Sequence, residues 1–228
     1  MRASDVMTSP VVVVGPDARI EDIAAILLRH SISAVPVVDS SDRLIGIVSE
    51  GDLYRRPEAG TGPRRSWLQA FAQQEEQARL FIKTHGHTAR EVMTTPVVSV
   101  AESADLGEVA ELLERHRIKR VPVVRDGKVV GVVSRANILQ GLVAKRYVPG
   151  AGKPTEGATR ERLLEALRAT DLAAAAHINA VIHDSVAHLW GLVQSQVEAD
   201  ALRVAAEGVP GIRRVESHIG LMPRSSFL

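Results

Sequence analysis

Side chains that could bind or activate a ligand occur in two matching sets along the chain. Ser49 and Asp52 follow the run Gly-Ile-Val, and Ser134 and Asn137 follow Gly-Val-Val. A serine three residues before an acidic residue is typical of a helix N-terminus, where serine caps free N–H groups and the helix dipole favours aspartate. Asp52 also offers a charged acceptor for two hydrogen bonds, whereas Asn137 keeps one acceptor without the charge. The pattern therefore indicates helix capping, ligand binding, or both together.

Signatures of the common catalytic sites are missing from the sequence. It contains no Walker loop, no Gly-rich dinucleotide fingerprint and no Gly-x-Ser-x-Gly elbow. It also contains no cysteine, which removes thiol catalysis, disulfides and thiolate metal ligands. The histidines of the C-terminal region, His177, His183, His188 and His218, have no His-x-x-x-His helix near them. We therefore expect neither enzyme activity nor a metal site.

The two sets of polar residues belong to a duplicated unit. Asp5–Pro10 returns as Glu91–Pro96, and Val35–Val38 returns as Val121–Val124, both 86 residues later. The Gly-apolar-apolar-Ser element returns 85 residues later, so one residue has been lost between the second and third elements. A duplication of this kind predicts two stacked units whose ligand sites are related by approximate two-fold symmetry.

Within each repeat the periodicity predicts the order strand, helix, strand, strand, helix. In the first repeat Val11–Val14 is a β-branched run, and apolar residues then recur at helical spacing from Ile20 to Leu28. Ala34–Val38 and Leu44–Val48 are apolar strands around a polar turn, and the second helix begins at Ser49. Strands that are apolar along their whole length suit a sheet covered on both faces, which a stacked pair provides. We therefore expect an α/β (α+β) fold.

Composition narrows the class of protein. The 228 residues are 45% hydrophobic, which is enough for the packed cores of two or three small domains. A net charge of +1 gives no general attraction to nucleic acid, and an aromatic content of 3% is too low for a base-stacking platform. No apolar run approaches the roughly 20 residues that span a bilayer, and the N-terminus has no signal pattern. We expect a cytoplasmic protein that does not bind nucleic acid.

The repeated elements resemble a known family. A Val-Met-Thr segment, an apolar-Pro-Val-Val strand and a Gly-apolar-apolar-Ser-x-x-Asp ending, twice in tandem over residues 1–145, are similar to paired CBS domains, named after cystathionine β-synthase. The resemblance implies two βαββα units, at residues 1–58 and 89–146, stacked as a pseudo-two-fold Bateman module. It further implies a regulatory, non-catalytic role, a homodimer, and clefts for adenosine compounds. AMP, ADP or ATP is the expected ligand, with S-adenosylmethionine ranked behind them.

The resemblance also carries the family's binding positions to this sequence. In the first unit Ser49 and Asp52 match the residues that hold the ribose, and the threonine of the Val-Met-Thr segment matches one that borders the cleft. The second unit repeats these positions with asparagine in place of aspartate. Arg120 matches a position that often contacts phosphate, although a solvated charge at the end of a strand is equally consistent. The candidate ligand residues are therefore Thr8, Ser49, Asp52, Thr94, Arg120, Ser134 and Asn137.

An insertion separates the two repeats. Residues 59–88 contain a linker rich in Arg, Pro and Gly, followed by apolar residues at roughly helical spacing that include Trp67 and Phe71. We expect an amphipathic helix there. It packs on its own repeats, or it forms an interaction surface for a second copy or a partner.

A Pro- and Gly-rich linker at residues 147–155 precedes a different pattern. Residues 156–220 predict helix, strand, strand, helix, strand, with a hairpin at Asp184-Ser185 and a tail at 221–228. The runs Leu-Trp-Gly-Leu-Val from Leu189 and Val-Pro-Gly-Ile from Val209 resemble the BON domain, whose fusion to a CBS pair is a bacterial arrangement. That family is associated with phospholipid surfaces or protein attachment. Trp190, on the face opposite Leu189, indicates a contact surface unless the chain's own loops cover it.

Two interpretations of the whole chain follow. In the first, the CBS pair senses an adenine nucleotide and the BON domain couples the bound state to a membrane or protein partner. In the alternative, the chain is a ligand-free structural or interaction module that acts through BON attachment and CBS-mediated dimerisation. Asp52 and Arg120 favour sensing, and Asn137 favours the alternative.

Overall fold

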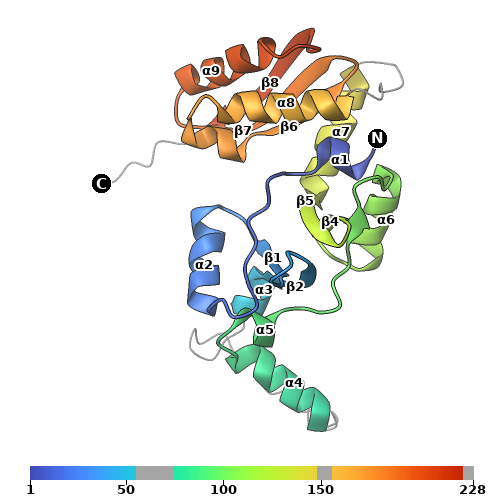
Figure 1. The fold of residues 1–228 in the computed structure, drawn as a ribbon, viewed down its shortest axis with the longest axis vertical. Coiled ribbons are helices and arrows are strands. Elements are labelled where there is room, and N and C mark those ends of the chain that lie inside the picture. Colours follow the sequence, from blue (N-terminus) through green and yellow to red (C-terminus); the bar gives the residue numbers. More distant parts are fainter. Residues whose placement is uncertain (55–73, 148–155, 223–228) are drawn as a thin grey trace. The chain divides into compact units, whose positions relative to one another are not determined.

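The chain folds into two compact units, each drawn from separate stretches of sequence. The computed structural model describes residues 1–54, 74–147 and 156–222. The first-repeat unit comprises Pro10–Ser99 and Val124–Val130, and the C-terminal unit comprises Met1–Ser9, Val100–Val123 and Gly131–Leu228 (Figure 1). The division does not follow the repeat boundaries, because the N-terminal residues of the first repeat belong to the C-terminal unit.

The core of the first-repeat unit lies between the helix α2 (Ile20–Arg29) and the hairpin of β1 (Ala34–Val38) and β2 (Leu44–Ser49). The other elements of this unit are α3 (Glu50–Leu53), α4 (Gln74–His85) and α5 (Ala89–Val92). β1 and β2 pair antiparallel, and the apolar face of α2 packs on them around Ile23, Val35 and Val48. The predicted order of helix, strand, strand and helix is confirmed for these elements.

The strand expected at Val11–Val14 is wrong for the first repeat. Only Val14 pairs, in an isolated parallel bridge to Val37. Its N–H donates to the Pro36 carbonyl at 3.1 Å and its carbonyl accepts from Val38 N–H at 2.9 Å. Extending this ladder in either direction would require an N–H from Pro36 or Pro16, and proline has none. In the second repeat Glu102 replaces Pro16, and the equivalent strand β3 (Val100–Ala101) forms.

The C-terminal unit combines the second repeat with the C-terminal domain. Its elements from the repeats are α1 (Ala3–Val6), β3, α6 (Leu106–Arg115) and α7 (Arg135–Tyr147), together with β4 (Arg120–Arg125) and β5 (Lys128–Ser134) except for their shared hairpin end at Val124–Val130. The strands β3, β4 and β5 form one sheet. The C-terminal domain contains α8 (Glu156–Arg168), a 3-10 turn η3 (Ala173–His177), β6 (Asn179–His183), β7 (Val186–Val193), α9 (Gln196–Glu207) and β8 (Arg214–Leu221). Its αββαβ order is the predicted one.

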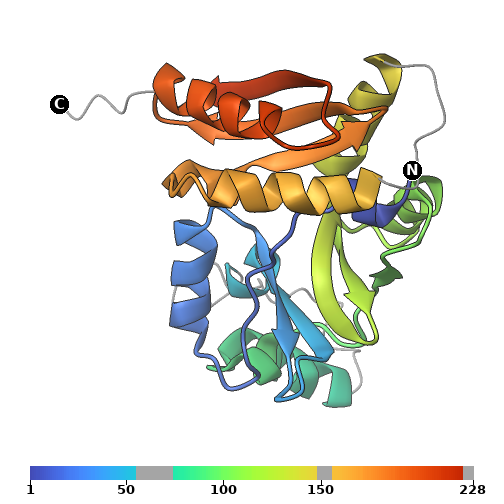
Figure 2. The same ribbon diagram turned by 45° about the horizontal axis from the view of Figure 1, so that its top comes forward.

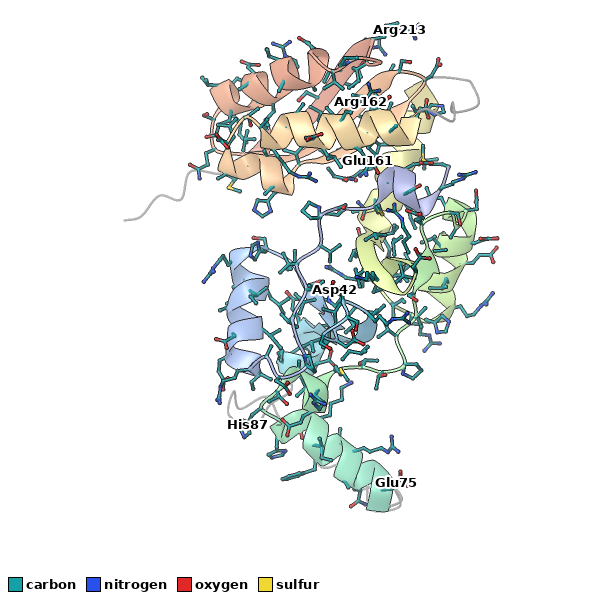
Figure 3. The ribbon with its side chains drawn as sticks, in the orientation of Figure 1. Asp42, Glu75, His87, Glu161, Arg162 and Arg213 are labelled. Carbon is teal, nitrogen blue, oxygen red and sulfur yellow. The ribbon has the colours of Figure 1, made fainter. Side chains whose placement is uncertain are left out.

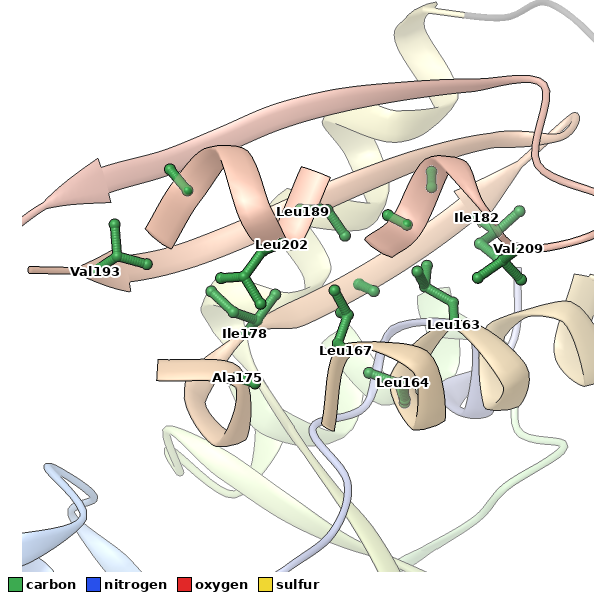
Figure 4. Close-up of a cluster of buried hydrophobic side chains, with 14 residues drawn as sticks. Leu163, Leu164, Leu167, Ala175, Ile178, Ile182, Leu189, Val193, Leu202 and Val209 are labelled. Atoms are coloured by element: carbon green, nitrogen blue, oxygen red, sulfur yellow. The ribbon is translucent and has the colours of Figure 1, made fainter. Parts of the chain in front are cut away.

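The C-terminal sheet has the order β6-β7-β8, with β6 antiparallel and β8 parallel to β7. The predicted hairpin turn is confirmed, since Asp184 and Ser185 both have positive φ, as a two-residue turn requires. The helices α8 and α9 cover one face of this sheet (Figure 2). Leu163, Leu189 and Leu202 meet in the core between the helices and the sheet (Figure 4).

The opposite face of this sheet carries stacked aromatic rings from β7 and β8. Trp190 and His218 face each other across the strands, with ring centroids 4.8 Å apart and planes 12° from parallel. His188 is fully buried beside them, and its Nδ1 lies 3.1 Å from Nε2 of His218. Burial, and next the neighbouring charge of His218, lowers the pKa of His188 to about 4.

The N-terminal segment of each repeat packs on the glycine-bearing strand of the other repeat. Met7 lies against Gly131 on β5, and Met93 lies against Gly46 on β2, so closely that a Cβ on either glycine would overlap the methionine side chain. The next residues continue the exchange through antiparallel bridges, Thr8 with Val132 and Thr94 with Ile47. Each repeat is therefore completed by a segment from its twin.

Replacing either motif glycine by alanine is expected to destabilise the protein by about 1–3 kcal/mol, the usual cost of overpacking a core. Gly15→Ala is the matched control, because nothing lies within 4 Å of a Cβ built there. Urea unfolding of Gly46→Ala, Gly131→Ala and Gly15→Ala measures the difference. Equal midpoints for the three variants would contradict the close packing of methionine on glycine.

His188 is expected to make the C-terminal domain less stable in acid. The imidazole takes up its proton at about pH 6.5 in the unfolded chain and only at about pH 4 in the folded chain. The unfolded state therefore binds more protons between these values, and stability falls as the pH drops from about 6.5 to about 4. Above pH 6.5 His188 is neutral in both states and does not change the free energy of unfolding. Below pH 4 it is protonated in both states, and the loss of stability that it causes no longer changes with pH.

The measurement is urea unfolding followed by Trp190 fluorescence in a Trp67→Phe background, at several pH values. His188→Gln should flatten the pH dependence of the midpoint in that window. His177→Gln, at an exposed position of the same domain, should keep the original dependence. A slope unchanged by His188→Gln would show that this side chain is not the cause.

Candidate functional site

The first candidate site lies where β2 ends and α3 begins. The Asp52 Oδ2 atom accepts hydrogen bonds from the Ser49 N–H at 2.9 Å and from the Ser49 hydroxyl at 2.7 Å. These bonds close the first turn of α3, so the capping predicted from the Ser-x-x-Asp spacing is confirmed. The Asp52 side chain is only 10% exposed. Its carboxylate is therefore held in one position near the protein surface.

Two further side chains join this carboxylate, and neither belongs to the first repeat. Lys83, near the end of α4, places Nζ 2.9 Å from Asp52 Oδ1 and 3.0 Å from the Thr94 hydroxyl. Thr94 is held in place by two backbone hydrogen bonds with Ile47, of 3.2 and 2.9 Å. We call Ser49, Asp52, Lys83 and Thr94 the Asp52 cluster.

The Asp52 cluster combines one carboxylate, one ammonium group and two hydroxyls. A carboxylate has about four acceptor positions, so Asp52 can accept bonds beyond those from Ser49 and Lys83. The Lys83 side chain is 40% exposed, and its ammonium group can reorient on the flexible stem toward an anion. The arrangement suits a ligand that carries both hydroxyl donors and negative charge.

The equivalent residues of the second repeat form a different network. Asn137 Oδ1 accepts from the Ser134 N–H at 2.8 Å and the Ser134 hydroxyl at 2.6 Å, as Asp52 does with Ser49. Asn137 Nδ2 lies 3.3 Å from the Thr8 hydroxyl and 3.4 Å from Gln140 Oε1. Asn137 is 4% exposed. The two sets share their local geometry, but the second carries no charge.

The threonines are grouped differently in the sequence and in the structure. The sequence assigns Thr8 to the first unit and Thr94 to the second; the structure places Thr94 in the Asp52 cluster and Thr8 beside Asn137. The exchange of N-terminal segments between the repeats is the physical reason. Arg120, the phosphate candidate, begins β4 in the C-terminal unit and is half-buried.

Sequence reasoning missed Lys83 and Gln140. Lys83 lies in the insertion, where the repeat offers no equivalent position for comparison. Gln140 is three residues beyond Asn137, on the same face of α7, and that helical spacing was the available signal.

The expected contact residues are only partly visible. Trp67 and Phe71 lie outside the described residues, and the insertion is described from α4 onward, where Phe81 and Ile82 are 61% and 51% exposed. Trp190 is half-buried against His218, and Leu192, two residues further along β7, is half-exposed. A contact surface at Trp190 stays a prediction.

Residues 1–54, 74–147 and 156–222 include no group of three or more His, Cys, Asp or Glu side chains placed to hold a metal ion. In the same ranges, no helix is both long enough and apolar enough to cross a membrane.

Comparison with protein families agrees with this geometry. The CBS domain family matches residues 3–58 and 89–144, and the BON domain family matches residues 155–222. The Asp52 and Asn137 sets therefore occupy equivalent places in two CBS domains, and the αββαβ domain is the part that matches BON.

Among known proteins, this chain is similar to the chloroplastic CBS domain-containing protein CBSX2 of Arabidopsis thaliana, with 29% identity over 139 residues. The match covers 58% of this chain and 58% of that protein, so the chain spans little more than half the length of this relative. It is also 26% identical to an inosine-5'-monophosphate dehydrogenase of Methanocaldococcus jannaschii, over 68% of this chain and 26% of that enzyme.

A solved structure of a CBS protein aligns with this chain. The crystal structure of CBSX2 in complex with AMP aligns with a TM-score of 0.55 and 29% identity, covering 62% of this chain and 96% of that one. Together with the two domain matches, this alignment shows that the chain is a tandem pair of CBS domains followed by a C-terminal BON domain.

Proposed function

We propose that this chain is a regulatory protein that senses an adenine nucleotide through the Asp52 cluster. The observation that carries the proposal is the pairing of the nearly buried Asp52 carboxylate with the ammonium of a half-exposed lysine, 2.9 Å apart, between two hydroxyl side chains. A ribose phosphate presents the complementary groups, a vicinal diol and an anion, on one small ligand.

Each member of the cluster has a role in this proposal. Asp52 accepts hydrogen bonds from the ribose hydroxyls, and charged acceptors make such bonds stronger. Ser49 keeps the carboxylate in place from the helix N-terminus. Lys83 turns from Asp52 to the phosphate, and Thr94 borders the ligand through the hydroxyl that it shares with Lys83.

The crystal structure of CBSX2 with AMP supports this choice of ligand class, because it is a structural relative of this CBS pair. AMP is the first ligand to test, followed by ADP and ATP, with S-adenosylmethionine behind them. The last of these carries a positive sulfonium in place of phosphate, which the Lys83 ammonium would repel.

Sensing becomes regulation if the ligand favours one arrangement of the chain over another. The difference in affinity between the two arrangements then sets how far the population shifts. We propose that the BON domain passes this shift to a membrane surface or a protein partner, and that the protein acts as a homodimer in the cytoplasm.

A second candidate function is attachment without a ligand. Asp52 already has hydrogen-bonding partners within the chain, and the end of the sheet beyond Trp190 exposes Leu192, Leu221 and Met222 by 50%, 52% and 47%. These observations favour a module that binds a partner through the BON domain. The titration below separates the two functions.

Isothermal titration with AMP and with adenosine tests the assigned roles. Asp52→Asn should weaken the binding of both ligands by about tenfold or more, because it removes the charge from hydrogen bonds worth about 1.5–3 kcal/mol. Lys83→Met should weaken the binding of AMP by a similar factor and leave the binding of adenosine almost unchanged, since only AMP carries the phosphate. Glu50→Gln, an exposed change on the same short helix, is the control.

Equal loss of AMP and adenosine in Lys83→Met would contradict the phosphate role of Lys83. Unchanged binding in Asp52→Asn would remove the cluster as the site. No binding of any adenosine compound to the original chain would favour the attachment module.

A further inference from the structure

Buried polar side chains anchor the BON domain to the N-terminal segment, which packs on the second CBS domain, and to α7 of that domain. Arg160 on α8 and Asn179 on β6 are 4% and 8% exposed. Arg160 Nη2 donates to the Met7 carbonyl at 2.5 Å and to Asn179 Oδ1 at 3.2 Å, and Nε donates to the Ala180 carbonyl at 2.7 Å. The neighbouring Glu161 and Arg162 are exposed (Figure 3), so Arg160 alone of the three points into this contact.

The anchor continues directly into the Asn137 network. Asn179 Nδ2 donates to the Val6 carbonyl at 3.3 Å and to Gln140 Oε1 at 2.5 Å. Gln140 Oε1 also accepts from Asn137 Nδ2. A continuous path of hydrogen bonds therefore runs from the BON domain to the residue that occupies the place of Asp52.

The direction of every hydrogen bond on this path is fixed from its two ends. At one end the Arg160 guanidinium can only donate, so Asn179 must turn its oxygen to Arg160 and its amide nitrogen to Gln140. At the other end the Ser134 N–H can only donate, so Asn137 must turn its oxygen to Ser134 and its amide nitrogen to Gln140. Gln140 Oε1 is then the shared acceptor of both amides.

This pattern requires a side chain at position 137 that accepts on one side and donates on the other. Asparagine does both, whereas an ionised aspartate only accepts. Aspartate would set a carboxylate oxygen against Gln140 Oε1. Turning the Gln140 amide around would instead set its NH2 group against the NH2 group of Asn179, which Arg160 holds in place. Asp52 has the Lys83 ammonium 2.9 Å away, whereas the side chains that the described hydrogen bonds bring to Asn137 are the uncharged Ser134, Thr8 and Gln140.

We propose that the polar set of the second CBS domain is the docking site of the chain's own BON domain, with Asn137 as its terminal contact. The set therefore holds a domain and not a second nucleotide, and the chain binds one nucleotide equivalent. The docking itself is independent of the proposed function, and only the stoichiometry rests on it.

Hydrogen exchange of the full chain without nucleotide tests the docking. Asn137→Asp should speed the exchange of amides in residues 1–9 and in α7 by about tenfold, because a buried mismatch of acceptors opens the contact. Gln140→Glu is the matched control. It keeps the shared acceptor, and its exchange should stay within about twofold of the original chain. Rapid exchange in both variants, or in neither, would overturn the assigned hydrogen-bond directions and with them the proposal.

A second pair covers the case in which Asn137→Asp does not fold. Gln140 is half-buried on α7, and Gln140→Leu removes the shared acceptor without introducing charge. It should open the contact as Asn137→Asp does, while Gln140→Glu keeps it closed. Protection unchanged in Gln140→Leu would overturn the docking.

Titration with AMP tests the stoichiometry. One equivalent per chain is expected, and two equivalents with one lost in Asn137→Ala would overturn the proposal. A chain that binds no AMP would refute the nucleotide site of the first CBS domain, and hydrogen exchange would still decide the docking.

Discussion

The contact of a methionine with a facing glycine sets the organisation of both CBS domains. Met7 on Gly131 and Met93 on Gly46 leave no room for a Cβ, so each N-terminal segment lies flat on the strand of the other repeat. The threonine after each methionine therefore lies beside the same strand of the other repeat. Thr94 thereby reaches Asp52, and Thr8 reaches Asn137. Both polar sets are composite, and neither would form within one isolated repeat.

A shared scaffold has allowed the two sets to diverge through their neighbours. At the first, the insertion brings Lys83, whose charge offsets that of Asp52. At the second, the BON domain brings Asn179 to Gln140, and the neighbouring Asn137 is 4% exposed. An unpaired carboxylate at such a position would carry a desolvation cost of several kcal/mol. Aspartate therefore stands where a lysine of the insertion lies beside it, and asparagine stands where the neighbouring segment carries the uncharged Asn179 of the BON domain.

The sequence predicted the elements well and their association less well. Helical and strand periodicity placed α2, β1, β2 and the BON hairpin, because these depend on local alternation of apolar residues. It failed at Val11–Val14, where two prolines on different segments limit the ladder to Val14. The sequence assigned each threonine to its own repeat, since an offset of 86 residues shows which positions are equivalent and not which copy they pack on. Lys83 was missed because it has no counterpart in the second repeat.

The anchor of the BON domain holds a charged side chain away from water. Burial lowers the pKa of Arg160 to about 10, so the guanidinium stays charged at neutral pH and must be held by dipoles. The hydrogen-bond acceptors that hold it are the carbonyls of Met7 and Ala180 and the amide oxygen of Asn179. The gain from these bonds is set against the cost of removing a charge from water. The anchor therefore depends on these three oxygen atoms keeping their positions around the guanidinium, and the Met7 carbonyl ties the N-terminal segment to the BON domain.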